Sequence, residues 1–419
     1  MPRAEHRRVA ICSVVLLGLL ALLQYWLTNR RPLQPGVTAV HEFGVTSSRD
    51  KGPGSLREAI FAADIAPQRA RIILRLSPIA LQSPLPPLVN PRGIEIEGAE
   101  PGAEIDARDL GTGAVFDVDA PNSVIDGIKI TNAPEQAVLV RADFFRLLNA
   151  KIVSCDEGLD AVEGIGNLIV DKTSFENNRV GITLASGGPG IIVRNNHFVG
   201  HKDAAIWAVR GSPFRVGQTR GFLLKSNYFE SDRISVVAGN VPLVAEENEF
   251  VKSHEAALFV MGENAVIRGN RIRNGAGIGV VAQGTEGIVI EDNELDHNQT
   301  IALLVRSSRS ALVNNNRVYD NGYGIAFVLG KRESPSFAAE NSVLRQRYDG
   351  IVVIGDSPVL RRNRALNNSS SGVSVLDFIP LTGGAIAANP FLENNILQGN
   401  KLNGTFRGEY RVREAERKQ

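Results

Sequence analysis

The sequence predicts an all-β protein: a right-handed parallel β-helix solenoid of about 22-residue coils with an N-terminal capping helix, preceded by one transmembrane helix. Three observations lead to this fold class. An Asn-x-apolar motif recurs at steps of 21, 22, 23, 23, 25 and 22 residues, short β-branched runs fill each step, and one long apolar run precedes them all. The motif begins at Asn227, Asn248, Asn270, Asn293, Asn316, Asn341 and Asn363.

The apolar run covers residues 9–27, and its 19 residues are about the length that crosses a bilayer. Arginines lie at both of its ends, and their count favours a cytoplasmic location for residues 1–8. No small-x-small cleavage site follows, so we interpret the run as an uncleaved signal anchor, with a removed signal peptide as the alternative. We therefore expect anchoring in the inner membrane, a linker at residues 28–40, and a β-helix domain in the periplasm or outside the cell.

Residues 41–110 are expected to form the N-terminal cap and the first coils. Ser55 and Glu58 have the spacing of a helix capping box, and Leu56 and Ile60 would share one face of the helix that follows. A solenoid has open strand edges only at its two ends. We therefore expect this helix to cover the first coil.

Residues 111–406 are predicted to form the parallel β-helix itself. Each repeat reads as short apolar pieces that alternate with period two and are too short for helices. A stacked Asn in a tight turn is most simply a ladder of amides bonded to one another and to the backbone. The charged tail at 407–419 would close the far end or fray.

Composition excludes several classes of function. The formal net charge of +1 gives no bulk attraction to nucleic acid. Cys155 is the single thiol beyond the apolar run, so no disulfide can form within the exported part. We find no Ser-His-Asp or Cys-His arrangement, and no transition-metal motif.

The segment GPGSLREAI at residues 52–60 carries a family resemblance. It resembles the N-terminal element of bacterial exported right-handed β-helix proteins of the pectate-lyase-like superfamily, which open with a Gly-Ser-Leu-Arg-x-Ala-Ile signature. The repeats from about 115 to 403 resemble the β-helix repeats of the same superfamily. That group contains polysaccharide lyases, hydrolases, epimerases and adhesins, so the resemblance implies a fold and leaves the activity open.

In enzymes of that superfamily the substrate usually lies along the outer face of one stacked strand. We therefore ask which residues here point outward from the strand that follows each Gly. The residue after each inward apolar side chain gives the series Asp117, Leu139, Asp160, Thr183, Trp207, Ser235, Ala257, Gly279, Ala302, Ala326, Val352 and Ser374.

Polar residues of this predicted face concentrate in the early coils, where neighbouring outward side chains would lie about 5 Å apart. We assign catalytic roles to Asp160, Asp117, Arg141 and Glu163, and a substrate-binding role to Asp119. Two such carboxylates suit acid–base glycoside hydrolysis. Alternatively, the group holds Ca²⁺ against a uronic acid and abstracts a proton; otherwise no cofactor is expected. The competing interpretation is a solvated face of ordinary ion pairs.

An insertion of the repeat between Asn196 and Asn227 is the second candidate feature, because loops on a rigid scaffold often carry function. It contains aromatic and cationic side chains of the kind that bind an anionic glycan. The candidate substrate-binding residues there are His201, Lys202, Trp207, Arg210 and Arg215.

Together these features predict a membrane-anchored extracytoplasmic β-helix protein that binds an acidic polysaccharide and cleaves or modifies it. If it is an enzyme, it would be a polysaccharide lyase or glycoside hydrolase. The alternative is a non-catalytic scaffold or adhesin that recruits an envelope protein or a glycan. The expected partners are a polysaccharide and the membrane, and no nucleic acid.

Overall fold

The computed structural model describes residues 40–99, 102–185, 189–209, 221–330, 334–380 and 384–411. The chain divides into two units, residues 1–40 and 41–419. Among the described residues, the buried apolar core begins at Val45 and continues through the coils, so the second unit has a continuous core of its own from which it can fold. In the described ranges no helix is long and apolar enough to cross a membrane, and the predicted anchor at 9–27 lies outside them.

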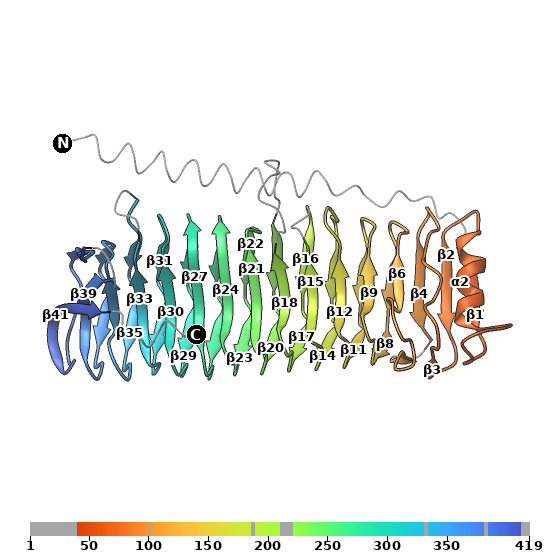
Figure 1. Cartoon of the computed structure of the whole chain (residues 1–419), viewed down its shortest axis with the longest axis horizontal. Helices are drawn as coiled ribbons and strands as arrows, with labels where there is room; N and C mark the ends of the chain where they lie inside the picture. Colours follow the sequence, from red (N-terminus) through yellow and green to blue (C-terminus); the bar gives the residue numbers. More distant parts are fainter. Residues whose placement is uncertain are drawn as a thin grey trace. The chain divides into compact units, whose positions relative to one another are not determined.

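The second unit is a parallel β-helix, in agreement with the predicted fold class (Figure 1). Its strands form three long parallel sheets, here named A, B and C, and each complete coil contributes one strand to each sheet. The capping helix α2 (Leu56–Asp64) lies at the end of the stack beside β1. Ser55 caps it through the Glu58 amide, while the Glu58 carboxylate accepts from Gly54.

Sheet A has 15 strands. They are β1 (His41–Val45), β2 (Ala70–Leu74), β4 (Ile94–Gly98), β7 (Val124–Asp126), β10 (Arg146–Leu148), β13 (Ile169–Asp171), β16 (Ile191–Arg194), β19 (Phe222–Lys225), β22 (Leu243–Glu246), β25 (Val266–Arg268), β28 (Val289–Glu291), β31 (Leu312–Asn314), β34 (Phe337–Ala339), β37 (Val359–Arg361) and β40 (Phe391–Glu393).

Sheet B has 13 strands. They are β3 (Ile79–Ala80), β5 (Ala103–Asp106), β8 (Ile128–Thr131), β11 (Lys151–Val153), β14 (Ser174–Glu176), β17 (His197–Val199), β20 (Tyr228–Glu230), β23 (Glu249–Val251), β26 (Arg271–Arg273), β29 (Glu294–Asp296), β32 (Arg317–Tyr319), β35 (Ser342–Leu344) and β38 (Arg364–Leu366).

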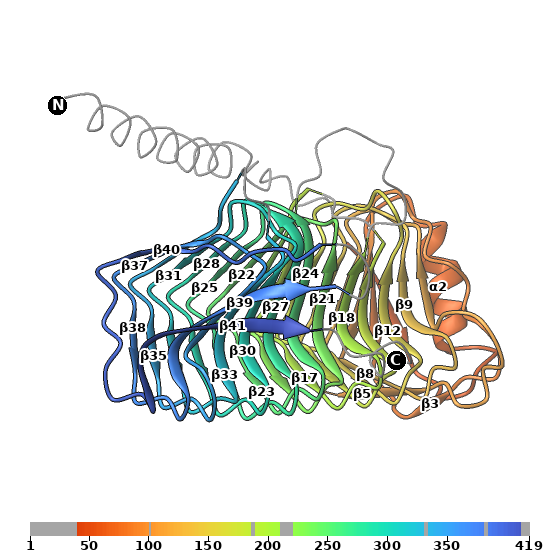
Figure 2. The same cartoon turned by 60° about the vertical axis from the view of Figure 1, so that its left-hand side comes forward.

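Sheet C also has 13 strands, which lie side by side in Figure 2. They are β6 (Phe116–Val118), β9 (Gln136–Val140), β12 (Glu157–Ala161), β15 (Val180–Leu184), β18 (Ala204–Val209), β21 (Ile234–Gly239), β24 (Ala256–Glu263), β27 (Ile278–Glu286), β30 (Ile301–Arg306), β33 (Tyr323–Val328), β36 (Ile351–Ile354), β39 (Ser371–Ile379) and β41 (Leu402–Arg411).

The recurring Asn forms the predicted ladder at the corner between sheets A and B. In each coil its Oδ1 accepts from the amide and the Nδ2 of the Asn in the previous coil, as Asn270 does from Asn248 at 3.0 Å for both. Its Nδ2 also reaches a main-chain carbonyl, that of Ala245 for Asn270. The ladder runs through Asn196, Asn227, Asn248, Asn270, Asn293, Asn316, Asn341, Asn363 and Asn395.

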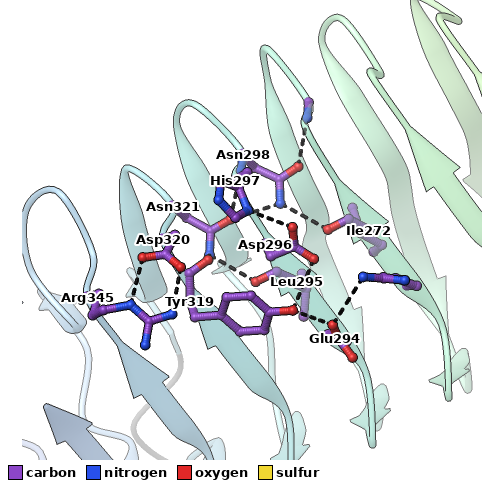
Figure 3. A network of polar contacts seen from close by, with 12 residues as sticks. Ile272, Glu294, Leu295, Asp296, His297, Asn298, Tyr319, Asp320, Asn321 and Arg345 are labelled. Atoms are coloured by element: carbon purple, nitrogen blue, oxygen red, sulfur yellow. Dashed lines mark hydrogen bonds and ion pairs between the residues drawn. The ribbon is translucent and has the colours of Figure 1, made fainter.

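A second amide ladder lies at the corner between sheets B and C (Figure 3). Asn298 donates from its main-chain N–H and from Nδ2 to Asn321 Oδ1, both at 2.9 Å. Outside it, the Tyr319 hydroxyl donates to the carboxylate of Glu294, and Arg345 pairs with Asp320. This corner therefore combines a buried amide ladder with polar contacts and an ion pair on the surface.

Small residues occupy the start of the sheet C strands. A Cβ added at Gly181 would lie 2.5 Å from the Ala205 carbonyl oxygen, and one at Gly279 would lie 2.5 Å from that of Ala302. Successive coils approach one another so closely here that only small side chains fit.

Four residues of the predicted outward series belong to these buried small positions and not to the outer face: Ser235, Ala257, Gly279 and Ala302. Strand pairing shows that the residue opposite Trp207 is Val237, two positions after Ser235. The prediction was wrong in these coils because a run of small residues gives no alternation from which to read the inward side.

Candidate functional site

Strand pairing brings the main predicted residues into one line on the outer face of sheet C. Asp117 pairs with Leu139, which pairs with Asp160. Asp160 pairs with Thr183, which in turn pairs with Trp207. Since adjacent strands lie about 4.8 Å apart, Asp160 is about 10 Å from Asp117 and from Trp207 along the stack. We name this line, with Arg141 beside it, the polar ribbon.

Arg141 is the cation of the polar ribbon and lies directly after β9. Its Nε lies 2.9 Å from Asp117 Oδ1 and 3.9 Å from Asp119 Oδ1. Within the described residues the terminal guanidinium nitrogens have no hydrogen-bond partner, and the side chain is 46% exposed. Arg141 therefore holds two carboxylates and still offers N–H donors to solvent.

Asp160 differs from the other acids of the ribbon because it has no hydrogen-bond or ion-pair partner in the described part of the chain. Burial raises the pKa of its carboxyl group to about 6, the negative charge of Glu157 adds to the rise, and Arg141 opposes it. A carboxyl group with a pKa near neutral pH exchanges protons readily at that pH. Asp160 is thus the acid–base group that this face offers.

Trp207 gives the ribbon its aromatic surface. The side chain points outward from β18 and is 42% exposed, although large apolar side chains usually gain from burial. Its ring lies two strands from Asp160 on the same face. The ribbon thus combines a titratable carboxyl group, a guanidinium group and an exposed indole within four strands.

Two predicted site residues lie elsewhere. Glu163 is exposed in the turn after β12 and has no ion pair with another described residue. His201 is 2% exposed, and its Nδ1 lies 2.7 Å from Asp232 Oδ1. Its Nε2 is 3.4 Å from Asn178 Nδ2, so the imidazole occupies a rung of the second ladder. His201 was predicted to bind substrate, but its ring takes the place of a ladder amide and lies buried, away from the outer face of sheet C.

Lys202 is exposed and lines a pocket of about 700 Å³ at the corner between sheets B and C. The pocket contains the side chains of Arg108, Asp156 and Arg179, and its wall includes Cys155. Burial raises the pKa of the Cys155 thiol to about 11, so it stays protonated at neutral pH. The predicted Arg210 and Arg215 lie outside the described residues.

A column of alternating charges, which the sequence analysis missed, begins at the pocket and follows the stack of coils. Arg179 binds Asp156 at 2.8 Å, Glu157 at 2.7 Å and Asp203 at 3.1 Å. Arg233 continues the column by pairing with Asp203 at 3.8 Å. The sequence does contain this pattern: an acidic or a basic residue stands directly before each of four successive sheet C strands. These residues are Asp156, Arg179, Asp203 and Arg233.

The expected Ca²⁺ site would need the carboxylates of the polar ribbon, and two of them, Asp117 and Asp119, are paired with Arg141. Among the described residues there is no group of three or more His, Cys, Asp or Glu side chains placed to hold a metal ion. Asp117 and Asp119 share one guanidinium group instead.

The family follows from comparison with known proteins. A family model described as a right-handed β-helix region matches residues 100–220 and 214–357, which together are more than half of the chain. This chain belongs to the right-handed β-helix family. No curated protein matches the sequence significantly.

Solved structures of other β-helix proteins share this fold. The A-module of the mannuronan C-5 epimerase AlgE6 from Azotobacter vinelandii has a TM-score of 0.50 and 11% identity, covering 88% of this chain and 98% of that module. The catalytic unit of the GH87 α-1,3-glucanase from Streptomyces thermodiastaticus strain HF3-3 has a TM-score of 0.53 and 13% identity. The match covers 87% of this chain and 70% of the glucanase chain. At these identities the likeness concerns the fold alone.

Proposed function

We propose that this β-helix protein binds an acidic polysaccharide along the polar ribbon of sheet C and transfers a proton to or from it through Asp160. The observation that carries the proposal is the unpaired Asp160, with a pKa of about 6, in line with an exposed Trp207. Two β-helix proteins of similar fold are named for polysaccharide-modifying activities, an epimerase and a glucanase, which supports this substrate class.

Each group of the ribbon has a distinct role in this proposal. The free N–H groups of Arg141 bind a sugar carboxylate, because a guanidinium fork matches a carboxylate in geometry and charge. The Trp207 indole stacks on a sugar ring through its apolar face. Asp160 lies between them on the stack and accepts a proton from the bound sugar.

The pairing of Arg141 favours a single proton-transfer residue over a pair of carboxylates. Asp117 forms an ion pair with Arg141 at 2.9 Å, which holds the guanidinium group in place. We therefore assign Asp117 and Asp119 as positioning residues. Lys202 remains a candidate for a contact at the edge of the ribbon, and we assign no catalytic role to Glu163, which is exposed in the turn after β12.

Turnover tests this assignment directly. The fragment of residues 41–419 is incubated with uronic-acid polymers, and new reducing ends, unsaturated products and epimerised sugars are measured. We expect Asp160→Asn to lower turnover by at least about 100-fold, as for loss of a general base. Glu163→Gln is the matched control, since it is an exposed acid two residues beyond β12, and we expect a change below threefold. Equal rates for wild type and Asp160→Asn would remove the catalytic assignment.

One observation favours a non-catalytic alternative, a scaffold or adhesin that binds glycan without turnover. Apart from Asp160, the acids Asp117 and Asp119 on the ribbon are paired, as expected of an ordinary solvated sheet face. This alternative predicts retention on immobilised polymer, with loss of retention in Trp207→Ala and no product. Full retention of Trp207→Ala would count against it.

We also propose that residues 9–27 anchor the protein in the inner membrane, with the β-helix in the periplasm or outside the cell. Their 19-residue length and apolar composition support this. The full chain should remain with membranes after carbonate extraction, and a Leu19→Arg, Leu20→Arg variant should be released. Release of the unchanged chain would contradict the anchor.

A further inference from the structure

The two ends of the solenoid differ in how they are covered. At the first end, the helix α2 buries Leu56 and Ile60 against the first coils. At the other end, β40 and β41 are the last strands of sheets A and C (Figure 1). Among the described residues, no strand pairs with the outer edge of either one. Such an edge presents main-chain N–H and C=O groups that can pair with another strand.

Apolar side chains are exposed at this second end. Leu392 on β40 is 37% exposed, whereas Leu360, its pairing partner in the preceding coil, is fully buried. The large apolar side chains exposed here are Ile386, Phe391, Leu392, Ile396, Leu402 and Phe406. We name β40, β41 and these side chains the open end. Covering them would remove apolar surface from water, which is favourable.

The strand β41 is complementary to a second copy of itself. Its segment Phe406-Arg407-Gly408-Glu409-Tyr410 has an aromatic residue on each side of the central Gly and opposite charges next to it. In an antiparallel pair of two copies centred on Gly408, Arg407 lies opposite Glu409, and Phe406 lies opposite Tyr410. A register centred on Arg407 or on Glu409 would place like charges opposite each other, which is destabilising. The residue order of β41 therefore favours one register.

We propose that the open end binds the open end of a second copy of this chain, in a two-fold dimer joined by antiparallel pairing of β41 with β41. Sheet C then continues across the dimer without an edge. Tyr410 already stacks on Phe378 of β39, with 6.1 Å between the ring centroids. Phe406 of the second copy extends this aromatic row, because Phe406 and Tyr410 lie on the same side of their strand.

A two-fold dimer is favoured over a head-to-tail chain of molecules because α2 covers the first end. The dimer joins the two open ends, and α2 then covers both of its outer ends, so association stops at two copies. A coil of about 22 residues, at about 3.3 Å per residue, has a cross-section on the order of 500 Å² with its outward side chains. Two ends bury on the order of 1,000 Å², which is near the lower limit for a specific interface.

The dimer leaves the polar ribbon accessible. In sheet C, β12 with Asp160 is ten strands from β41, and β18 with Trp207 is eight strands from it. The two Asp160 residues of a dimer would lie roughly 100 Å apart along one continuous sheet. A polymer long enough to reach both ribbons is held with higher avidity than by one, provided that the ribbon binds polysaccharide as proposed above.

Sedimentation velocity of the 41–419 fragment, and of the full chain in detergent, tests the dimer. We expect both wild-type proteins to be dimeric at about 200 µM. Arg407→Glu and Glu409→Arg each place like charges opposite one another twice in the dimer, so each should raise the Kd about tenfold or more. Arg317→Glu is the matched control, an exposed arginine on the interior strand β32, and should leave the Kd unchanged.

A mixture of the two charge variants gives the sharpest test. An equimolar mixture of Arg407→Glu and Glu409→Arg should form a mixed dimer with a Kd near that of wild type, because opposite charges then face one another across the two strands. An effect on folding within one copy would not be relieved by mixing. If either variant fails to fold by circular dichroism, Phe406→Ser replaces it, and it should also weaken the dimer.

Several results would overturn the proposal. They are a wild-type protein that is monomeric at about 200 µM, charge variants that dimerise as strongly as wild type, and a mixture that stays monomeric. The 41–411 fragment keeps β41 and should dimerise as the 41–419 fragment does. Dimers that form only after residues 412–419 or 1–40 are removed would also overturn the proposal, since those residues would then cover the edge.

Discussion

Asp160 illustrates how position, and not residue type, distinguishes one carboxyl group from its neighbours. Asp117 is two strands away on the same face and forms an ion pair with Arg141. Asp160 has no such partner, and burial raises the pKa of its carboxyl group to about 6. The coil period predicted that the two would align, but it gave no information about which one Arg141 would bind.

The raised pKa of Asp160 makes stability depend on pH. The folded-state pKa lies above the ordinary value of 3.8, so this group stabilises the fold fully below about pH 4 and loses that contribution as the pH rises through 6. In Asp160→Asn, this loss of folding stability with rising pH should be absent. At pH 7 we expect the variant to gain about 1 kcal/mol, since one pKa unit corresponds to about 1.4 kcal/mol and solvent screens a half-exposed group.

Urea unfolding at pH 4 and at pH 7 measures this effect. The difference in unfolding free energy between wild type and Asp160→Asn should grow between the two pH values. A difference that stays constant would mean that Asp160 titrates as an ordinary surface acid.

The buried pair of His201 and Asp232 supports a second prediction at this scale. Both side chains are fully buried, and Asp232 Oδ1 accepts from the His201 amide and lies 2.7 Å from its Nδ1. Asp232→Ala removes that acceptor and should destabilise the fold by about 3 kcal/mol.

The double variant His201→Asn, Asp232→Asn is the informative control. It recreates the amide pairing seen between Asn298 and Asn321 at 2.9 Å. We expect its melting temperature to be no lower than that of wild type, because an amide oxygen at position 232 can accept the same hydrogen bonds, while Asp232 Oδ2 has no partner among the described residues. A double variant less stable than Asp232→Ala would contradict the ladder role of His201.

At the scale of the elements, the amide ladders and the strand pairs support one another. Stacked phenylalanines reinforce sheet B from within: Phe198 and Phe229 are 4.8 Å apart between ring centroids, and Phe229 and Phe250 are 4.7 Å apart. The Asn period predicted the coils and the ladder correctly because each buried amide must find a partner at every coil. It could not predict the small positions of sheet C, which depend on how closely the main chains approach.

Removing one rung of the first ladder should be costly. Asn270→Ala deletes the acceptor for the amide and Nδ2 of Asn248 and leaves the carbonyl of Ala245 without its donor. We expect a loss of about 3 kcal/mol, since each buried group left unsatisfied costs about 1–3 kcal/mol. Asn314→Ala is the matched control, an outward Asn of β31, and should cost less than about 0.5 kcal/mol. Equal losses in chemical denaturation would show that the ladder adds nothing.

For the molecule as a whole, the two ends of the solenoid differ from its middle, because strand edges at the ends can pair with other chains and aggregate. Interior strands pair on both sides, while an end strand exposes its hydrogen-bonding groups. The helix α2 lies beside the first coils, and β41 extends the last sheet by pairing with β39 as far as Arg411. The sequence predicted the capping helix from its capping box, but it left open whether the C-terminal tail would pair or fray.

Truncation tests the C-terminal end. A chain that ends at residue 401 loses β41 and exposes the nine-residue strand β39 as an edge. We expect it to aggregate or to be cleaved by protease within its last coils. A chain that ends at residue 411 keeps β41 and should behave as wild type. Equal solubility and protease resistance of the two truncations would contradict a protective role for β41.

The fluorescence of Trp207 tests the central claim most directly, since the chain has two tryptophans and Trp207 is the single one in the 41–419 fragment. Titration of that fragment with uronic-acid polymers should give a saturable shift of its emission, and Arg141→Ala should weaken the response by about tenfold or more. An emission spectrum that stays unchanged across a panel of acidic polysaccharides would contradict binding on the polar ribbon.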